Sequence, residues 1–162
     1  ECLQLEKLAS LYEISLPIHF NKLKQACKNQ ALFELLSHGT TESIKEFFDK
    51  NPLSAKELLT ACEYQPLHIL AATRDEPSLC RYLIEQLNIY PQVRNVNDET
   101  PLHLAARMGH THTVRYLAAL EGDYPNMRSS HLQYTPLQEA KANGHRDIVA
   151  FLSIKRPEAK AK

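Results

Sequence analysis

The sequence predicts an all-α fold, a solenoid in which helical hairpins stack side by side and project β-turn loops. A heptapeptide at 100–106, Thr-Pro-Leu-His-Leu-Ala-Ala, recurs 35 residues later at 135–141 as Thr-Pro-Leu-Gln-Glu-Ala-Lys. It also stands 35 residues earlier, at 65–71, as Gln-Pro-Leu-His-Ile-Leu-Ala, and only its apolar positions persist at 30–36. Self-similarity at a fixed period is the signature of repeat architectures, whose units bury their apolar faces only by stacking.

The first helix of each unit is bounded by recognisable start and stop signals. Thr100 can cap the helix with its hydroxyl, and Pro101 suits the first helical position, where no backbone hydrogen bond is lost. Apolar residues three and four positions apart then share one face. Gly109 accepts the left-handed conformation that commonly follows a helix. We therefore expect helices over 101–108 and 136–143.

The second helix carries Val114, Leu117 and Leu120 on one face and is followed by a turn at 122–125. Each helix of the hairpin runs about eight to ten residues, fewer than the ~12–15 that give even marginal stability to an isolated helix in water. Packing against the neighbouring unit must therefore hold each hairpin together.

The period divides most of the chain into repeats. We expect four of them, at 30–64, 65–99, 100–134 and 135–154. Residues 1–29 lack the pattern and are expected to form an N-terminal helical cap or the end of a preceding domain, while 155–162 read as a solvated tail. Phe33 and Leu36 indicate burial of the first repeat against that cap. Because the chain begins at Glu1 rather than Met, we expect it to be a segment of a longer protein.

This pattern resembles the ankyrin repeat, whose signature is Thr-Pro-Leu-His-x-Ala-Ala followed two residues later by Gly-His. The resemblance is close over 65–152 and weaker over 30–64. The residues that carry it are Pro66, Leu67, His68, Thr100, Pro101, Leu102, His103, Gly109, Thr135, Pro136, Leu137 and Gly144. It implies that the imidazoles of His68 and His103 tie neighbouring turns by hydrogen bonds, and that the array binds another protein.

Several positions depart from the family pattern. Gln138 and Glu139 replace its His and Leu, and Arg74 occupies the glycine position of the second unit. Lys141 replaces the second Ala, which we expect in a last unit whose outer face meets solvent. The array is therefore divergent rather than close to the consensus.

Composition and charge argue against several classes of function. The 162 residues carry 19 Lys plus Arg and 19 Asp plus Glu, and this zero formal charge disfavours a nucleic-acid-binding protein. No apolar stretch reaches the ~18 residues of a membrane span. The sequence has no glycine-rich phosphate loop, nucleophile motif or paired-carboxylate loop, so we expect no catalysis, no cofactor and no small-molecule substrate. We expect a monomeric, cytoplasmic protein.

Metal binding is also unexpected, although the chain has eight histidines and four cysteines. The cysteines include no C-x-x-C pair, and we expect reduced, mostly buried thiols. His110 and His112 are two positions apart and would point to different faces of a helix.

Charge is spread unevenly along the array. The net formal charge of the successive repeats is −3, −2 and +1, and it is +3 for the last repeat with its tail. A partner with the opposite gradient would be oriented along the array, mainly through its association rate and register.

The resemblance implies partner contacts at the loop tips before each Thr-Pro and at the end of each first helix. The tip candidates are Tyr64, Asn97, Glu99, His131, Leu132 and Tyr134. The first-helix candidates are Thr73, Arg107, Met108 and Asn143.

Tyr and Arg anchors often dominate binding energy, so we expect Tyr64, Tyr134, Arg107 and Met108 to contribute most. The alternative for either tyrosine is a ring that lies along its own loop. If Arg107 and Tyr134 lie at the surface, replacing both by Ala should leave the melting temperature nearly unchanged.

Three classes of function remain open. The leading interpretation is a non-catalytic protein-interaction module, such as an adaptor, inhibitor or targeting arm. The alternative is an ankyrin-type domain that recruits substrates or host targets for a larger enzyme or a secreted bacterial effector, which would act in the host cytosol. The missing Met and the unrelated first 29 residues motivate that alternative. A small enzyme or metal protein comes third, with little support from the scattered histidines and cysteines.

Overall fold

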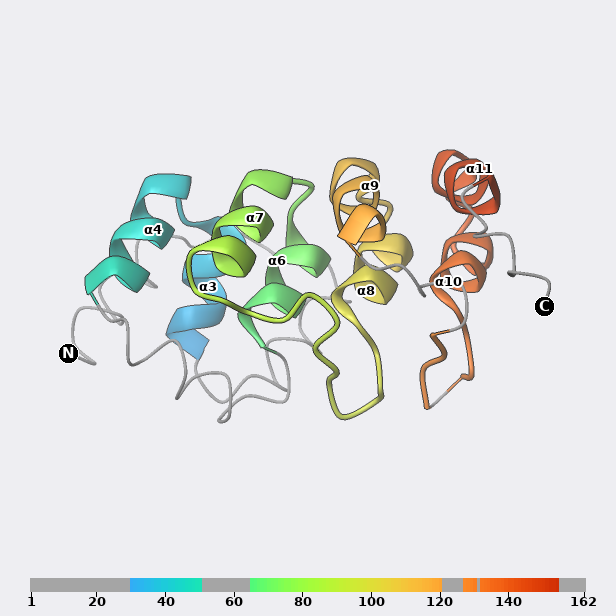
Figure 1. The fold of residues 1–162 in the computed structure, drawn as a ribbon, viewed down its shortest axis with the longest axis horizontal. Helices are drawn as coiled ribbons and strands as arrows, with labels where there is room; N and C mark the ends of the chain where they lie inside the picture. Colours follow the sequence, from blue (N-terminus) through green and yellow to red (C-terminus); the bar gives the residue numbers. More distant parts are fainter. Residues whose placement is uncertain (1–29, 51–64, 121–126, 131, 155–162) are drawn as a thin grey trace, which may run out of the picture.

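The computed structural model describes residues 30–50, 65–120, 127–130 and 132–154, which form four helical hairpins (Figure 1). Their helices are α3 (Gln30–His38), α4 (Thr41–Lys50), α6 (Pro66–Thr73), α7 (Pro77–Glu85), α8 (Pro101–Met108), α9 (Thr111–Leu120), α10 (Pro136–Ala142) and α11 (Arg146–Ile154). The described residues contain no strand, and the predicted all-α fold is confirmed. The predicted N-terminal cap at 1–29 and the tail at 155–162 lie outside them.

The hairpins stand side by side in one row (Figure 1). The first helices, α3, α6, α8 and α10, form one layer, and the second helices, α4, α7, α9 and α11, form the other. Helix α6 packs against both α3 and α8, and α8 packs against α10. Successive first helices therefore lie as neighbouring layers, as the 35-residue period predicts.

The apolar core runs along the inside of this stack. In α8 the side chains of Leu102, Ala105 and Ala106 are fully buried, and the two alanines allow the hairpin helices to approach closely. Phe33 and Leu36 of α3 are likewise fully buried and belong to a cluster that extends through α6 and α7. Burial between hairpins supplies the stability that helices of this length lack by themselves.

A histidine in each of two hairpins joins its helix to the loop that follows. The backbone N–H of Thr100 donates to Nδ1 of His103 at 3.1 Å, so the ring proton is assigned to Nε2. Nε2 then donates to the carbonyl oxygens of Met127 and Tyr134, both at 3.1 Å. In the preceding hairpin, Nε2 of His68 lies 3.0 Å from the carbonyl oxygen of Glu99. These are the bonds that the resemblance implies for both histidines.

The replacement of histidine by Gln138 preserves the start of α10. The N–H of Thr135 donates to Oε1 of Gln138 at 2.9 Å, and the N–H of Gln138 donates to Oγ1 of Thr135 at 3.3 Å. These two bonds form a reciprocal capping box that satisfies two backbone donors at the helix start. Further along α10, Lys141 is exposed, as expected for an outer unit.

The equivalent glycines Gly109 and Gly144 differ in their surroundings. Both have left-handed backbone, with φ of 82° and 75°. A Cβ on Gly109 would lie 2.7 Å from Cε1 of His145, whose Nε2 donates to the carbonyl oxygen of Arg107 at 2.8 Å. No described residue lies within 4 Å of a Cβ on Gly144. At the same position Arg74 has φ of −139°, so α6 ends with extended backbone and needs no glycine.

We predict that Gly109→Ala destabilises the chain more than Gly144→Ala. Gly144→Ala should lower the free energy of unfolding by about 1 kcal/mol through its backbone conformation alone. Gly109→Ala should lower it by about 1–3 kcal/mol more, because the new methyl group displaces the His145 ring between two hairpins. Urea denaturation of both variants measures the difference, and equal losses would show that the close approach of His145 contributes nothing.

A second prediction concerns pH. His68 is fully buried, and this burial lowers the pKa of its imidazole to about 4. Between pH 6.5 and pH 4 the unfolded chain therefore binds a proton at this residue that the folded chain does not. The free energy of unfolding should therefore fall, through this residue, by at most about 3 kcal/mol as the pH drops from 6.5 to 4.

His68→Gln isolates this contribution, because Gln can still donate to the Glu99 carbonyl and does not titrate. We expect the stability advantage of the unmodified chain over His68→Gln to shrink between pH 6.5 and pH 4 in urea denaturation. A difference that stays constant over this range would contradict the prediction.

Candidate functional site

Two loop tips project beside α8 and α10 and alternate between buried and exposed side chains. In the first tip Asn95 is buried and Val96 is exposed. Oδ1 of Asn95 accepts hydrogen bonds from the N–H groups of Asn97 and Glu99, both at 2.9 Å, and so fixes the turn from inside. The side chain of Val96, 64% exposed, is held outward on a rigid loop.

The second tip repeats this arrangement one hairpin further along. Ser129 is buried, and its N–H donates to the carbonyl oxygen of Tyr134 at 3.0 Å. Leu132 is 50% exposed. The N–H of Ser130 donates to the carbonyl oxygen of Asn97 at 2.8 Å and joins the two tips directly. The two tips therefore lie next to each other.

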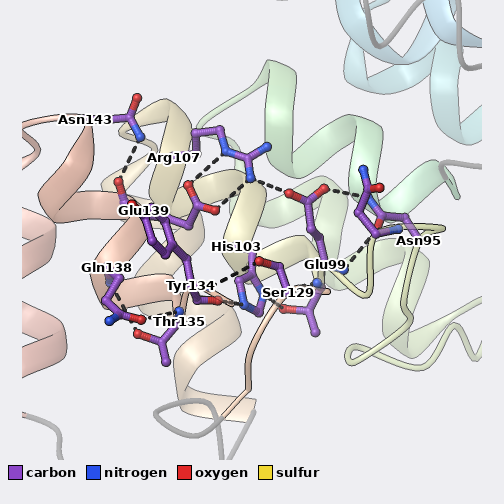
Figure 2. A network of polar contacts seen from close by, with 12 residues as sticks. Asn95, Glu99, His103, Arg107, Ser129, Tyr134, Thr135, Gln138, Glu139 and Asn143 are labelled. Carbon is purple, nitrogen blue, oxygen red and sulfur yellow. Dashed lines mark hydrogen bonds and ion pairs between the residues drawn. The ribbon is translucent and has the colours of Figure 1, made fainter. Parts of the chain in front are cut away.

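A largely buried ion-pair network lies beneath the tips and joins α8 to α10 (Figure 2). Nε of Arg107 donates to Oε2 of Glu139 at 3.0 Å, and Nη2 donates to Oε1 at 2.8 Å, so the guanidinium holds this carboxylate with two bonds. Nη2 also donates to Oε1 of Glu99, whose Oε2 accepts from Nδ2 of Asn95 at 2.8 Å. One cation thus binds an acid from the loop that precedes its own helix and an acid from the next hairpin.

Hydrogen bonding and charge pairing outweigh burial in this network. Burial alone raises the pKa of Glu99, but the hydrogen bonds from Asn95 and Arg107 hold it below its ordinary value. Burial alone lowers the pKa of Arg107, and the hydrogen bonds to Glu139 and Glu99 raise it above its ordinary value. Glu99 and Arg107 therefore both stay charged at neutral pH.

Two predicted partner-binding residues, Arg107 and Glu99, take part in this network. The side chain of Glu99 is 6% exposed and that of Arg107 is 31% exposed, and their polar groups bind one another and Glu139. The structure places them in the joint between two hairpins. This placement replaces our sequence-based expectation that Arg107→Ala with Tyr134→Ala leaves the melting temperature unchanged.

One residue in the sequence pointed to this network, although the repeat pattern alone could not show which side chain it pairs with. Glu139 stands at the position of Ile69 and Leu104, so an acid occupies a buried apolar position. A buried carboxylate requires a cation. Only the packing of α8 against α10 shows that Arg107 supplies it.

The other predicted contacts are dispersed. Tyr64 and His131 lie outside the described residues. Thr73 is half-buried, and its hydroxyl donates to the carbonyl oxygen of Ile69 at 2.7 Å. Exposed Asn143 follows α10 and donates from Nδ2 to the carbonyl oxygen of Glu139 at 2.9 Å.

The remaining three candidates are half-buried, namely Asn97, Met108 and Tyr134. The structure brings Asn97 and Leu132 together at the tips, and it places Thr73 on a separate hairpin. Ala72 and Ile69 are buried, so α6 presents almost no side chain to solvent. Sequence reasoning also missed the exposed Arg94 and Arg128, which no position in the family signature marks.

Two further features, metal-ligand clusters and membrane-spanning helices, are not found in the described part of the chain. Within those residues no three His, Cys, Asp or Glu side chains come together as metal ligands. None of the helices described is both long and apolar enough to cross a membrane.

We predict that Arg107→Ala lowers the free energy of unfolding by about 2–4 kcal/mol, because it leaves two buried carboxylates without their cation. Adding Glu139→Leu, which restores the residue type of Leu104, should recover at least about 1 kcal/mol. Exposed Lys141→Ala is the control and should change stability by less than about 0.5 kcal/mol. Urea denaturation of the set measures these effects, and an Arg107→Ala loss as small as that of the control would exclude a structural network.

Comparison with known proteins agrees with this architecture. A family model described as ankyrin repeats in three copies matches residues 23–128 and again 67–162, well over half of the chain. None of the curated proteins matches it.

Proposed function

Because the chain belongs to the ankyrin-repeat family, whose members are generally protein-interaction modules, we propose that it binds a partner protein, without catalysis, through its two loop tips. The surface that we assign to the partner, called here the tip surface, consists of Val96, Asn97, Leu132 and Tyr134. Met108 and Asn143, at the ends of the neighbouring first helices, extend it.

The observation that carries this proposal is that apolar side chains are exposed to solvent on two loop tips held by hydrogen bonds. Val96 and Leu132 are 64% and 50% exposed on tips that the Ser130–Asn97 bond holds together. Loops ordered before binding lose less conformational entropy in a complex than mobile ones. Apolar groups held in water on such loops gain the most from being covered by a partner.

The burial of α6 restricts where a partner can lie. Ile69 and Ala72 are inaccessible, so the first-helix layer offers contacts mainly at the ends of α8 and α10. A recruiting domain of a larger enzyme or effector would use the same binding step and the same tips.

A paired-variant capture experiment tests the proposal. Val96→Ser with Leu132→Ser removes both exposed apolar side chains of the tip surface. The control, Leu120→Ser with Ile154→Ser, removes two exposed apolar side chains, 44% and 83% exposed, from the second-helix layer. Both variants should melt like the unmodified chain, since surface changes of this kind have small effects.

We expect proteins captured from a cytosolic extract by the unmodified chain to fall about fivefold or more with the tip variant and to persist with the control. Quantitative mass spectrometry of the captured fractions measures this ratio. Equal capture by all three proteins would exclude the tips, and loss in the control alone would place binding on the second-helix layer.

A further inference from the structure

We propose that the tip surface recognises an extended, acidic segment of its partner in which carboxylates flank an apolar side chain. This inference rests on the proposed function and assigns a chemistry to the partner. It follows from two exposed arginines, Arg94 and Arg128, that lie in the same two loops as the exposed Val96 and Leu132.

Each arginine is fixed to the backbone of its own tip. Nη1 of Arg94 donates to the carbonyl oxygen of Asp98 at 3.0 Å, and Nη1 of Arg128 donates to that of Gln133 at 2.9 Å. Asp98 and Gln133 both have left-handed backbone, with φ of 55° and 56°. A turn with a left-handed residue therefore recurs in adjacent hairpins, one residue longer in the second tip, and each turn holds one guanidinium in place.

These two guanidinium groups keep their positive charge toward solvent. Each donates to a neutral carbonyl oxygen, and within the described residues neither is paired with a carboxylate. The buried acids below, Glu99 and Glu139, are already bound by Arg107. Asp98 is the one exposed acid in the described parts of the two tips, so those described parts carry a net positive charge on their outward face.

The spacing of the hairpins indicates the form of the partner segment. Packed helices lie about 8–10 Å apart, and an extended chain advances about 3.3 Å per residue. Residues two and four positions apart in an extended chain share one face, so two carboxylates four residues apart, about 13 Å along the chain, can reach the long side chains of one arginine in each tip. A large apolar side chain between them would cover Val96 and Leu132. Arginine suits this role because its planar fork can hold a carboxylate with two parallel bonds.

The same features disfavour a nucleic acid as the ligand. A phosphate backbone is bound by a continuous basic surface, whereas here the described parts of the two tips expose only two cations, together with apolar side chains and Asp98. The chain as a whole has zero formal charge.

Peptide selection tests this chemistry on the intact chain. A phage-displayed library of random linear peptides is selected against the protein, and the most enriched sequence is synthesised with a fluorescein label. We expect the enriched peptides to share two Asp or Glu residues around a Leu, Ile, Met or Phe. Fluorescence anisotropy then gives the affinity of the synthetic peptide at low and high NaCl.

Arg94→Gln with Arg128→Gln should weaken that peptide about tenfold, and raising NaCl should weaken its binding to the unmodified chain. The control, Lys141→Gln with Arg146→Gln, removes two exposed charges from the last hairpin and should leave the affinity unchanged. A peptide with Asn or Gln in place of its acids should bind the unmodified chain about tenfold more weakly. This last measurement does not depend on how the variants fold.

Failure to enrich any peptide, enrichment without acids, or equal affinity for the Arg94→Gln/Arg128→Gln variant would overturn the inference. So would binding of a fluorescein-labelled single-stranded RNA that the same variant abolishes. Capture that still depends on Val96 and Leu132 would then leave the proposed function standing and remove only the acidic partner.

Discussion

The hydrogen bonds of His103 are the interaction on which the rest of this structure depends. One ring nitrogen accepts from the backbone of Thr100 and fixes the start of α8, and the other donates to two carbonyl oxygens, of Met127 and Tyr134, in the following loop. A helix of eight residues is unstable alone in water, so this bond and the apolar burial around it must form together. Each hairpin is thereby placed by its neighbour.

Different kinds of interaction hold successive hairpins together along the stack. Between α3 and α6 the contact is a continuous apolar cluster, whereas between α8 and α10 it includes the ion pair of Arg107 with Glu139. On the second-helix layer, cations lie over the rings of the next hairpin. They are Lys45 over Tyr82 at 5.7 Å, Arg81 over Tyr116 at 5.4 Å and Arg115 over Phe151 at 5.3 Å. The last hairpin is thus held partly by charge, which makes its attachment sensitive to its acids and bases.

Framework residues and the proposed binding residues are separate side chains within the two described tips. The inward side chains, such as Asn95 and Ser129, bond to backbone groups and fix the turn. The outward ones, Val96 and Leu132, are exposed and belong to the proposed tip surface. Because the two sets alternate along the chain, a partner surface can change without loss of the turn. This separation is a physical reason for a repeat array to support many binding specificities on one scaffold.

The sequence by itself determined the period, the helices of the last two hairpins and the positions of the tips. Proline at the first helical position, glycine after the helix and apolar residues at helical spacing are local signals, and they act over a few residues. Only the tertiary structure showed that Arg107 and Glu99 form an ion pair within the protein and that Ala72 is buried. Both results depend on which side chains of adjacent hairpins meet. A periodic pattern gives the order of the hairpins, but the partner of a buried charge depends on the packing between them.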